Sequence, residues 1–246
     1  RQCLVMAIGV LVLAAGSGSR LGAAVPKAFV RLGASSLLGY AVRSALAARD
    51  VACVVVASPA EWLDVAIEQT EPLSRAHGIP VQVVPGGAER GDSVLAALRW
   101  LPQECDVVLV HDAARAFAPP ELFDRVAASV TERHPAVVPG EPVVDTIKIV
   151  DATGVVVSTP ERSGLRQIQT PQGFRRDVLL RAHREHGSLA SDDAGLVERL
   201  GLPVLVVAGD GRALKVTTPD DLDRAQRLAH VLSDDDSTHD DDASRR

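Results

Sequence analysis

Residues 8–22 read IGVLVLAAGSGSRLG and combine two patterns. The first six residues are almost all aliphatic, which predicts a short strand buried on both faces. The next nine are rich in glycine, which predicts a loop whose backbone N–H groups can approach phosphates closely. A buried strand that leads into such a loop indicates an α/β fold with a ligand at the end of the strand.

The same pattern continues along the chain. Beyond the first strand, valine-rich strands are expected at 51–57, 81–84, 106–110, 136–139 and 204–207. Amphipathic helices are expected at 36–49, 60–76, 92–101, 120–133, 175–186, 192–200 and 220–232. Apolar strands separated by helices predict a mostly parallel sheet that helices cover on both faces.

The alternation breaks near residue 140. Residues 146–150 and 155–158 are rich in β-branched side chains and flank Asp-Ala-Thr-Gly154, which predicts a hairpin. This segment, about 141–160, is expected to project as a β-arm and to pack on a second subunit. We expect one domain over 6–232, and a disordered acidic tail over 233–246.

Composition excludes several classes of protein. The 246 residues carry a net charge of −6 and only 3% aromatic residues, which argues against a nucleic-acid partner. The apolar stretch before the glycine-rich loop is too short to span a membrane and has no clear cleavage site. Three scattered cysteines, Cys3, Cys53 and Cys105, indicate a reducing compartment. We therefore expect a cytoplasmic protein without a membrane partner.

The cations near the loop favour a triphosphate ligand. The loop has no Gly-Lys-Ser/Thr, and its third glycine is one residue too late for a dinucleotide fingerprint. Arg20 and Lys27 would suit several phosphates, although a plain strand-to-helix turn with a surface Arg is the alternative. Lys27, Lys148 and Lys215 are the only lysines among 26 basic residues, which suggests that some sites require a compact ammonium group.

Two residues follow a buried strand at the ligand-binding edge of such a sheet, His111 and Asp112. A carboxylate facing a triphosphate is a common ligand of Mg²⁺, and a helix-capping Asp is the alternative. For the histidine, a buried hydrogen-bonded imidazole is favoured over a catalytic base.

Three further segments carry polar side chains. The segment PGGAERGDS, residues 85–93, offers paired glycines at a strand end and predicts either a ligand contact or a turn with a helix cap. Lys215 is flanked by apolar residues and needs a partner, while Thr218 and Asp221 can cap the last helix. Arg162, with Thr146 and Thr170, could bind a phosphate monoester.

Together these motifs resemble the 2-C-methyl-D-erythritol 4-phosphate cytidylyltransferase family. The matching segments, in chain order, are LAAGSGSRLG with PKAF, GGAERGDSV, HDAAR, PVVDTIK, TPERSGLRQIQTPQGF, SDDAGLVERLG and GRALKVTTPDDL. The resemblance implies a Rossmann-like fold and a homodimer in which each arm reaches the active site of the partner.

The resemblance also implies roles for individual residues. Arg20, Lys27 and Lys215 would stabilise the transition state, Asp112 would bind Mg²⁺, and CTP would contact Ala14, Ala15, Gly16, Gly18, Gly87, Arg90 and Ser93. Methylerythritol phosphate would be held by Arg115, Thr146, Arg162 and Thr170. The acceptor phosphate would attack the α-phosphorus of CTP and expel pyrophosphate, with no need for a strong base.

Other functions remain open on the sequence. A cytidylyltransferase for another polyol phosphate, such as ribitol 5-phosphate, would share the fold and the phosphate chemistry. A non-catalytic nucleotide sensor would be expected to lose Lys27, Asp112 or Lys215, and the chain has all three. A NAD-dependent oxidoreductase does not fit the glycine spacing or the absence of an acidic residue about twenty positions after the loop.

Overall fold

The computed structural model describes residues 7–16, 25–187 and 192–230. Gly18, Arg20 and the acidic segment 233–246 lie outside the described residues, so the expectations for them stay predictions. In the described part of the chain no helix is long and apolar enough to cross a membrane.

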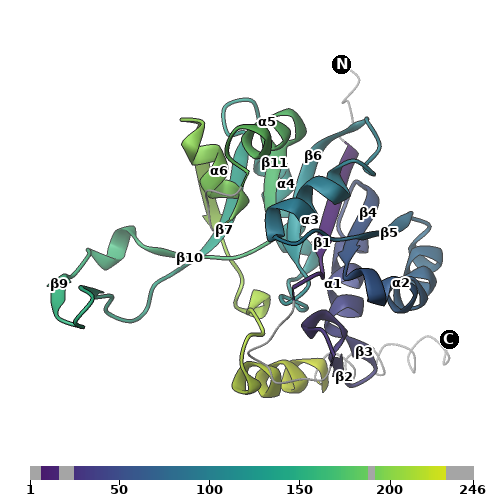
Figure 1. Ribbon diagram of the computed structural model, residues 1–246, viewed down its shortest axis with the longest axis horizontal. Helices are drawn as coiled ribbons and strands as arrows, with labels where there is room; N and C mark the ends of the chain where they lie inside the picture. Colours follow the sequence, from purple (N-terminus) through teal and green to yellow (C-terminus); the bar gives the residue numbers. More distant parts are fainter. Residues whose placement is uncertain (1–6, 17–24, 188–191, 231–246) are drawn as a thin grey trace, which may run out of the picture.

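A twisted eight-stranded sheet forms the centre of the molecule (Figure 1). Its order is β10-β7-β11-β6-β1-β4-β5, and β12 also pairs with β7. The strands are β1 (Ala7–Leu13), β4 (Val51–Ser58), β5 (Val81–Pro85), β6 (Cys105–Asp112), β7 (Ala136–Pro142), β10 (Arg166–Ile168), β11 (Gln172–Arg175) and β12 (Val204–Ala208). The pairs of β1 with β4 and β6 are parallel, as are β4 with β5 and β7 with β12. The mostly parallel sheet predicted from the sequence is confirmed.

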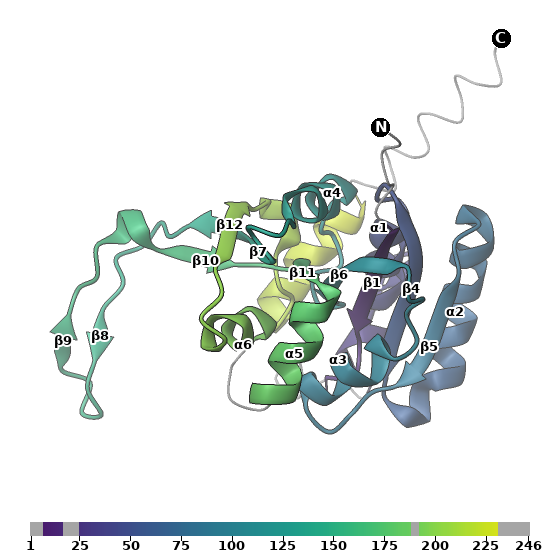
Figure 2. The same ribbon diagram turned by 90° about the horizontal axis from the view of Figure 1, so that it is seen from above.

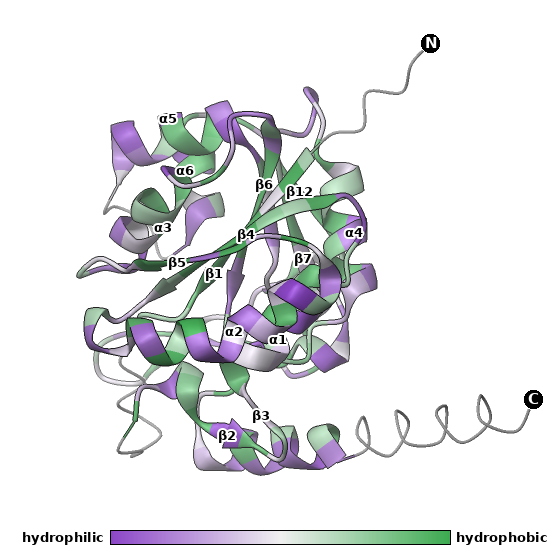
Figure 3. Ribbon diagram, turned by 90° about the vertical axis from the view of Figure 1, so that its right-hand side faces the viewer, coloured by the Kyte–Doolittle hydropathy of each residue, from purple (hydrophilic) through white to green (hydrophobic). Residues whose placement is uncertain are grey.

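Helices cover both faces of this sheet, as the apolar strands require. One buried cluster joins one face to α1 (Leu37–Leu46), α2 (Leu63–His77) and α4 (Pro120–Ser129). A second cluster joins the other face to α3 (Arg90–Leu98), α5 (Arg176–His186) and α6 (Asp193–Arg199). In Figure 3 the strands are largely green, whereas α2 alternates between green and purple, in keeping with a helix that has one buried face.

Two strands of the central sheet escaped the sequence analysis, as did the small pair of strands within residues 31–36 that is described below. The short strands β10 and β11 run antiparallel to β7, and β11 also runs antiparallel to β6. Each has three or four residues, and β11 reads Gln-Gly-Phe-Arg, so no valine-rich run marks it. Gly173 is required by close packing, because a Cβ there would lie 2.7 Å from Val126 Cγ1.

A short hairpin and the last helix close one end of the molecule. Strands β2 (Arg31–Leu32) and β3 (Ser35–Ser36) pair with each other, and a small cluster packs them near the helix over 219–230. The predicted capping box is confirmed: Asp221 N–H donates to Thr218 Oγ1 (3.2 Å), and Thr218 N–H donates to Asp221 Oδ2 (2.9 Å).

At neutral pH, Asp221→Ala is expected to lower the free energy of unfolding by about 1 kcal/mol, the usual effect of losing a helix cap. Hydrogen bonds from Thr217 and Thr218 lower the pKa of Asp221 from 3.8 to about 2. The carboxylate therefore stabilises the fold fully above about pH 4, and this contribution disappears as the pH falls toward 2. Urea unfolding of the wild-type and Asp221→Ala proteins at about pH 7 and about pH 3 measures this contribution to the free energy of unfolding. A difference that does not shrink in acid contradicts the assignment.

The predicted arm leaves the body of the domain as an extended excursion (Figures 1 and 2). At its tip β8 (Ile149–Val150) pairs antiparallel with β9 (Val156–Ser158), and Gly154 has φ +86° in the connecting turn. The hairpin is shorter than the expected 146–150 and 155–158. The excursion is longer than 141–160, because the returning chain rejoins the sheet only at β10.

Candidate active site

A cavity of about 390 Å³ opens where β1 and β6 end. Parallel α/β sheets bind ligands at this edge, because the loops after the strands converge there. The cavity brings together nine residues that the sequence analysis singled out: Ala14, Ala15, Gly16, Lys27, Gly87, Arg90, Ser93, Asp112 and Lys215. They come from segments spread over 200 residues of the chain, so the fold gathers the separate motifs into one site.

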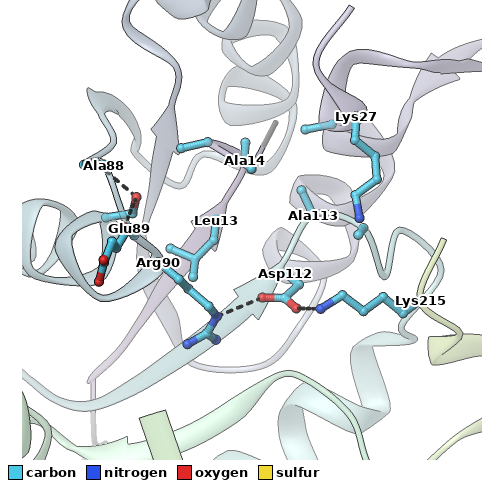
Figure 4. A pocket seen from close by; sticks show the side chains of 15 residues that line it. Leu13, Ala14, Lys27, Ala88, Glu89, Arg90, Asp112, Ala113 and Lys215 are labelled. Atoms are coloured by element: carbon cyan, nitrogen blue, oxygen red, sulfur yellow. Dashed lines mark hydrogen bonds and ion pairs between the residues drawn. The ribbon is translucent and has the colours of Figure 1, made fainter. Parts of the chain in front are cut away.

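Asp112 lies between two cations (Figure 4). Its Oδ2 accepts a hydrogen bond from Lys215 Nζ at 2.8 Å, and its Oδ1 lies 3.5 Å from Arg90 Nε. Burial raises the pKa of Asp112, but the charges of Arg90 and Lys215 outweigh this and lower it to about 2. The carboxylate is therefore ionised at neutral pH. It forms ion pairs across the cavity and is not a helix cap.

Lys27 approaches from a different wall of the same cavity. It opens the short 3-10 helix η2 (Lys27–Phe29), in which Ala28 and Phe29 are buried and fix the backbone. In Figure 4 its ammonium group points into the cavity toward the region of Asp112 and Lys215. Two of the three lysines in the chain thus line the cavity, which agrees with the argument from lysine scarcity.

The paired glycines of the segment 85–93, Gly86 and Gly87, are required by close packing. A Cβ on Gly86 would lie 2.5 Å from the Cβ of Ala15, and one on Gly87 would lie 2.1 Å from the Cβ of Asp92. Ser93 Oγ accepts a hydrogen bond from Gly87 N–H at 3.0 Å and so ties the turn to α3. The helix cap considered for this segment is also present, since Glu89 and Asp92 form a capping box.

His111 is a buried structural imidazole, as predicted. Its Nδ1 lies 3.0 Å from Thr170 Oγ1, and burial lowers its pKa to about 4, so the ring is neutral at pH 7. The Thr170 hydroxyl also accepts a hydrogen bond from Asp112 N–H at 3.0 Å. Thr170 is only 5% exposed, so in this structure its hydroxyl orients the end of β6.

The other residues expected at the acceptor do not line this cavity. Arg115 donates to the backbone oxygens of Ala213 (2.7 Å) and Ile168 (3.1 Å), which joins the Lys215 segment to β10. Arg162 lies on the arm and donates to the oxygen of Val144. Thr146 also lies on the arm, outside the cavity.

Of the two carboxylates that line the cavity, Glu89 caps helix α3, which leaves Asp112 as the candidate ligand for a cation. Among the described residues, no group of three or more His, Cys, Asp or Glu is placed to hold a metal ion. Mg²⁺ usually takes one or two protein carboxylates and completes its shell with water and substrate phosphates. The ionised Asp112, in a cavity that cations line, is therefore suited to bind Mg²⁺ that enters together with a nucleoside triphosphate.

Comparison with known proteins assigns the family. The model of the 2-C-methyl-D-erythritol 4-phosphate cytidylyltransferase family matches residues 8–230. The chain belongs to this family. Relatives with that name include one from Saccharopolyspora erythraea, 52% identical over 91% of this chain and 99% of its own length. Another, from Nocardia farcinica, is 51% identical over 91% of this chain and 93% of its own.

Solved structures agree with the family. The 2-C-methyl-D-erythritol 4-phosphate cytidylyltransferase of Thermus thermophilus matches with a TM-score of 0.72 and 37% identity, over 92% of this chain and all of that one. A 4-diphosphocytidyl-2C-methyl-D-erythritol synthase from Anaerococcus prevotii matches with a TM-score of 0.78 and 25% identity, over 92% and 99% of the two chains. The α/β fold expected from the family resemblance is confirmed.

A cytidylyltransferase site needs its cations held in place, and the structure adds two residues that the sequence analysis missed. Asp193 and His183 form a buried pair that bonds Arg90 from behind the cavity. The only signal in the sequence was the Ser-Asp-Asp run at the start of a predicted helix, which reads as a cap. Asp192 is that cap, accepting from Gly195 N–H at 3.0 Å, and this ordinary role concealed its neighbour.

Proposed function

We propose that this chain transfers a cytidylyl group from CTP to 2-C-methyl-D-erythritol 4-phosphate. The products are 4-diphosphocytidyl-2-C-methyl-D-erythritol and pyrophosphate, in non-mevalonate isoprenoid biosynthesis. The observation that carries the proposal is the cavity that Lys27, Arg90 and Lys215 line together with Asp112, in a chain of this family. Three cations that line one cavity suit a polyphosphate ligand.

The reaction needs positioning and charge stabilisation. An oxygen of the acceptor phosphate is already anionic, so it can attack the α-phosphorus of CTP without a base, and pyrophosphate leaves from the opposite side. We assign Lys27, Lys215 and Arg20 to the negative charge at the reacting phosphorus. Ala14, Ala15, Gly16, Gly18, Gly87, Arg90 and Ser93 are assigned to CTP.

Asp112 is assigned to a divalent cation, for which we propose Mg²⁺. When bound, the ion would neutralise charge on the triphosphate oxygens. Asp112 would then share its oxygens between the ion, Lys215 and Arg90. This sharing requires at least one cation of the chain to turn toward the phosphates when the nucleotide enters.

The arm is assigned to a second copy of the chain. Its large apolar side chains are solvent-exposed in one subunit: Val144, Ile147, Ile149, Val150, Val155, Val156 and Val157. Such an apolar patch on an extended segment is unfavourable in water and is typical of a subunit interface. In a homodimer the arm would carry Thr146 and Arg162 to the partner's cavity, next to Arg115 and Thr170.

The double variant Val155→Asp/Val157→Asp tests whether the arm forms the dimer interface. We expect it to shift the protein from dimer to monomer in sedimentation analysis and to lower activity, because two buried charges oppose association. A double change on the exposed face of α2, Glu68→Gln/Glu71→Gln, is the matched control. A wild-type protein that is monomeric at assay concentrations contradicts the proposal.

Arg162→Ala is expected to raise the KM for the acceptor by about tenfold or more, with less than about twofold change in the KM for CTP. The guanidinium pairs with a phosphate monoester, and the nucleotide cavity does not contain it. Steady-state kinetics with each substrate varied in turn gives both constants. Equal changes in the two constants would remove Arg162 from the acceptor site.

An assay of pyrophosphate release from CTP tests which phosphate the enzyme uses as acceptor. The assay uses Mg²⁺ with either 2-C-methyl-D-erythritol 4-phosphate or ribitol 5-phosphate. Release with the first acceptor alone supports the proposal. Release with the second alone would mean that the reaction type is right but the proposed acceptor is wrong. Tight CTP binding without release in either case would favour a non-catalytic sensor.

The cytoplasmic location of the protein stays a prediction.

A further inference from the structure

A buried carboxylate lies behind the cavity and joins three helices. Asp193 is the first residue of α6 and is 1% exposed. Its Oδ1 lies 2.8 Å from Nε2 of His183 in the last turn of α5, and its Oδ2 accepts from Arg90 Nη1 at the start of α3. A buried carboxylate is costly without partners of opposite charge, so this arrangement fixes all three side chains.

Arg90 connects this pair to the cavity. Its guanidinium bonds Asp193 through Nη1 and faces Asp112 through Nε, at 3.5 Å. Because the guanidinium is a rigid planar fork, an anion that holds one edge sets the direction of the others. Burial lowers the pKa of Arg90, but Asp193 and Asp112 outweigh this and raise it, so the cation stays charged.

The pair is also packed firmly against α3. A Cβ on Gly91 would lie 3.0 Å from the backbone oxygen of Gly187 and 3.6 Å from the imidazole of His183. The residue after Arg90 is therefore in close contact with the end of α5. The start of α3 thus contacts the end of α5 through its backbone and α6 through the Arg90 side chain.

We propose that Asp193, oriented by His183, is a positioning residue that aims Arg90 at the nucleotide. Without the Asp193 carboxylate, the ion pair that Arg90 retains is the one with Asp112. It would then draw the Asp112 carboxylate away from Lys215 and from the cation that Asp112 is assigned to bind. The inference rests on the proposed function, because it takes CTP as the ligand that Arg90 meets.

The test is the affinity for CTP with Mg²⁺, measured by titration calorimetry, which requires no turnover. Asp193→Asn keeps the size and removes the charge, and we expect it to raise the Kd for CTP by about tenfold. In steady-state kinetics the KM for CTP should rise with it, while the KM for the acceptor changes less than about twofold. Asp192→Asn is the matched control. Its carboxylate accepts hydrogen bonds from Gly195 N–H in α6 and from Gln172 Nε2 in β11, and it forms no hydrogen bond or ion pair with Arg90.

A double-mutant cycle distinguishes an effect of Asp193 on the position of Arg90 from an effect on the stability of the fold. If Asp193 acts through Arg90, Asp193→Asn causes no further loss of CTP affinity in an Arg90→Ala background. Should Asp193→Asn not fold, His183→Leu and His183→Gln replace it, and the glutamine, which can still donate to Asp193, should retain more affinity for CTP.

The outcomes are distinct. Wild-type protein that binds no CTP contradicts the proposed function itself. Wild-type protein that binds CTP overturns only this inference in either of two cases. In the first, Asp193→Asn binds within about twofold of wild type. In the second, the loss of CTP affinity caused by Asp193→Asn persists in the Arg90→Ala background, or Asp192→Asn causes an equal loss.

Discussion

Lys27→Ala lowers kcat by about a hundredfold or more, with a smaller change in the KM for CTP. An ammonium group that meets negative charge growing at the reacting phosphorus stabilises the transition state more than the bound substrate. The position of Lys27 on the short helix η2, with its end directed into the cavity, suits this role (Figure 4). Rapid-quench measurement of a single turnover gives the chemical step directly.

Arg75→Ala is the control for this prediction. Arg75 is also a cation, but it lies on the exposed face of α2 and pairs with Glu71 at 2.6 Å. Its loss should leave the single-turnover rate of the nucleotide site within a few-fold of wild type. If folded Lys27→Ala protein retains activity within about tenfold of wild type, Lys27 has no part in the transition state.

Asp112→Asn lowers kcat/KM by about two to three orders of magnitude in the presence of Mg²⁺. The amide cannot supply the anionic ligand that a hard cation prefers, and it no longer fixes Lys215 by an ion pair. Affinity for CTP in EDTA should not fall, because Arg90 and Lys215 lose a competing anion. This division between catalysis and metal-free binding distinguishes a metal ligand from a residue that only supports the fold.

Asp106→Asn provides the control for Asp112. Asp106 lies near the opposite end of the same strand, β6, and is exposed. Its replacement should leave both activity and Mg²⁺ dependence unchanged. If Asp112→Asn keeps the Mg²⁺ dependence and about a tenth or more of the activity, the metal lies elsewhere.

The fold was predictable wherever burial decides the residue type. Strands β1, β4 and β6 each contain an uninterrupted, buried run of aliphatic residues, so their existence and direction follow from the sequence. Strand β11 could not be found in this way, because it has four residues and pairs antiparallel between two strands that are already recognisable. Its place depends on the tertiary pairing and not on its own pattern.

The site was predictable to the extent that its residues stand in motifs. Lys27 was singled out as a cation near the glycine-rich loop, and Asp112 and Lys215 as charges beside apolar runs. The fold brings all three to one cavity. The role of Thr170 in orienting His111 was not predictable, because it depends on a contact across 59 residues of chain. Asp193 was concealed for the same reason, since its partner Arg90 is 103 residues away.

The most direct test of the central claim follows the α-phosphorus of CTP. The protein is incubated with CTP radiolabelled at the α-phosphate, Mg²⁺ and 2-C-methyl-D-erythritol 4-phosphate, and the products are separated. The account predicts that the label moves into a product containing both the cytidine and the polyol, while the released pyrophosphate is unlabelled. Label that stays in CTP or appears only in CMP, with no adduct of the polyol, would contradict it.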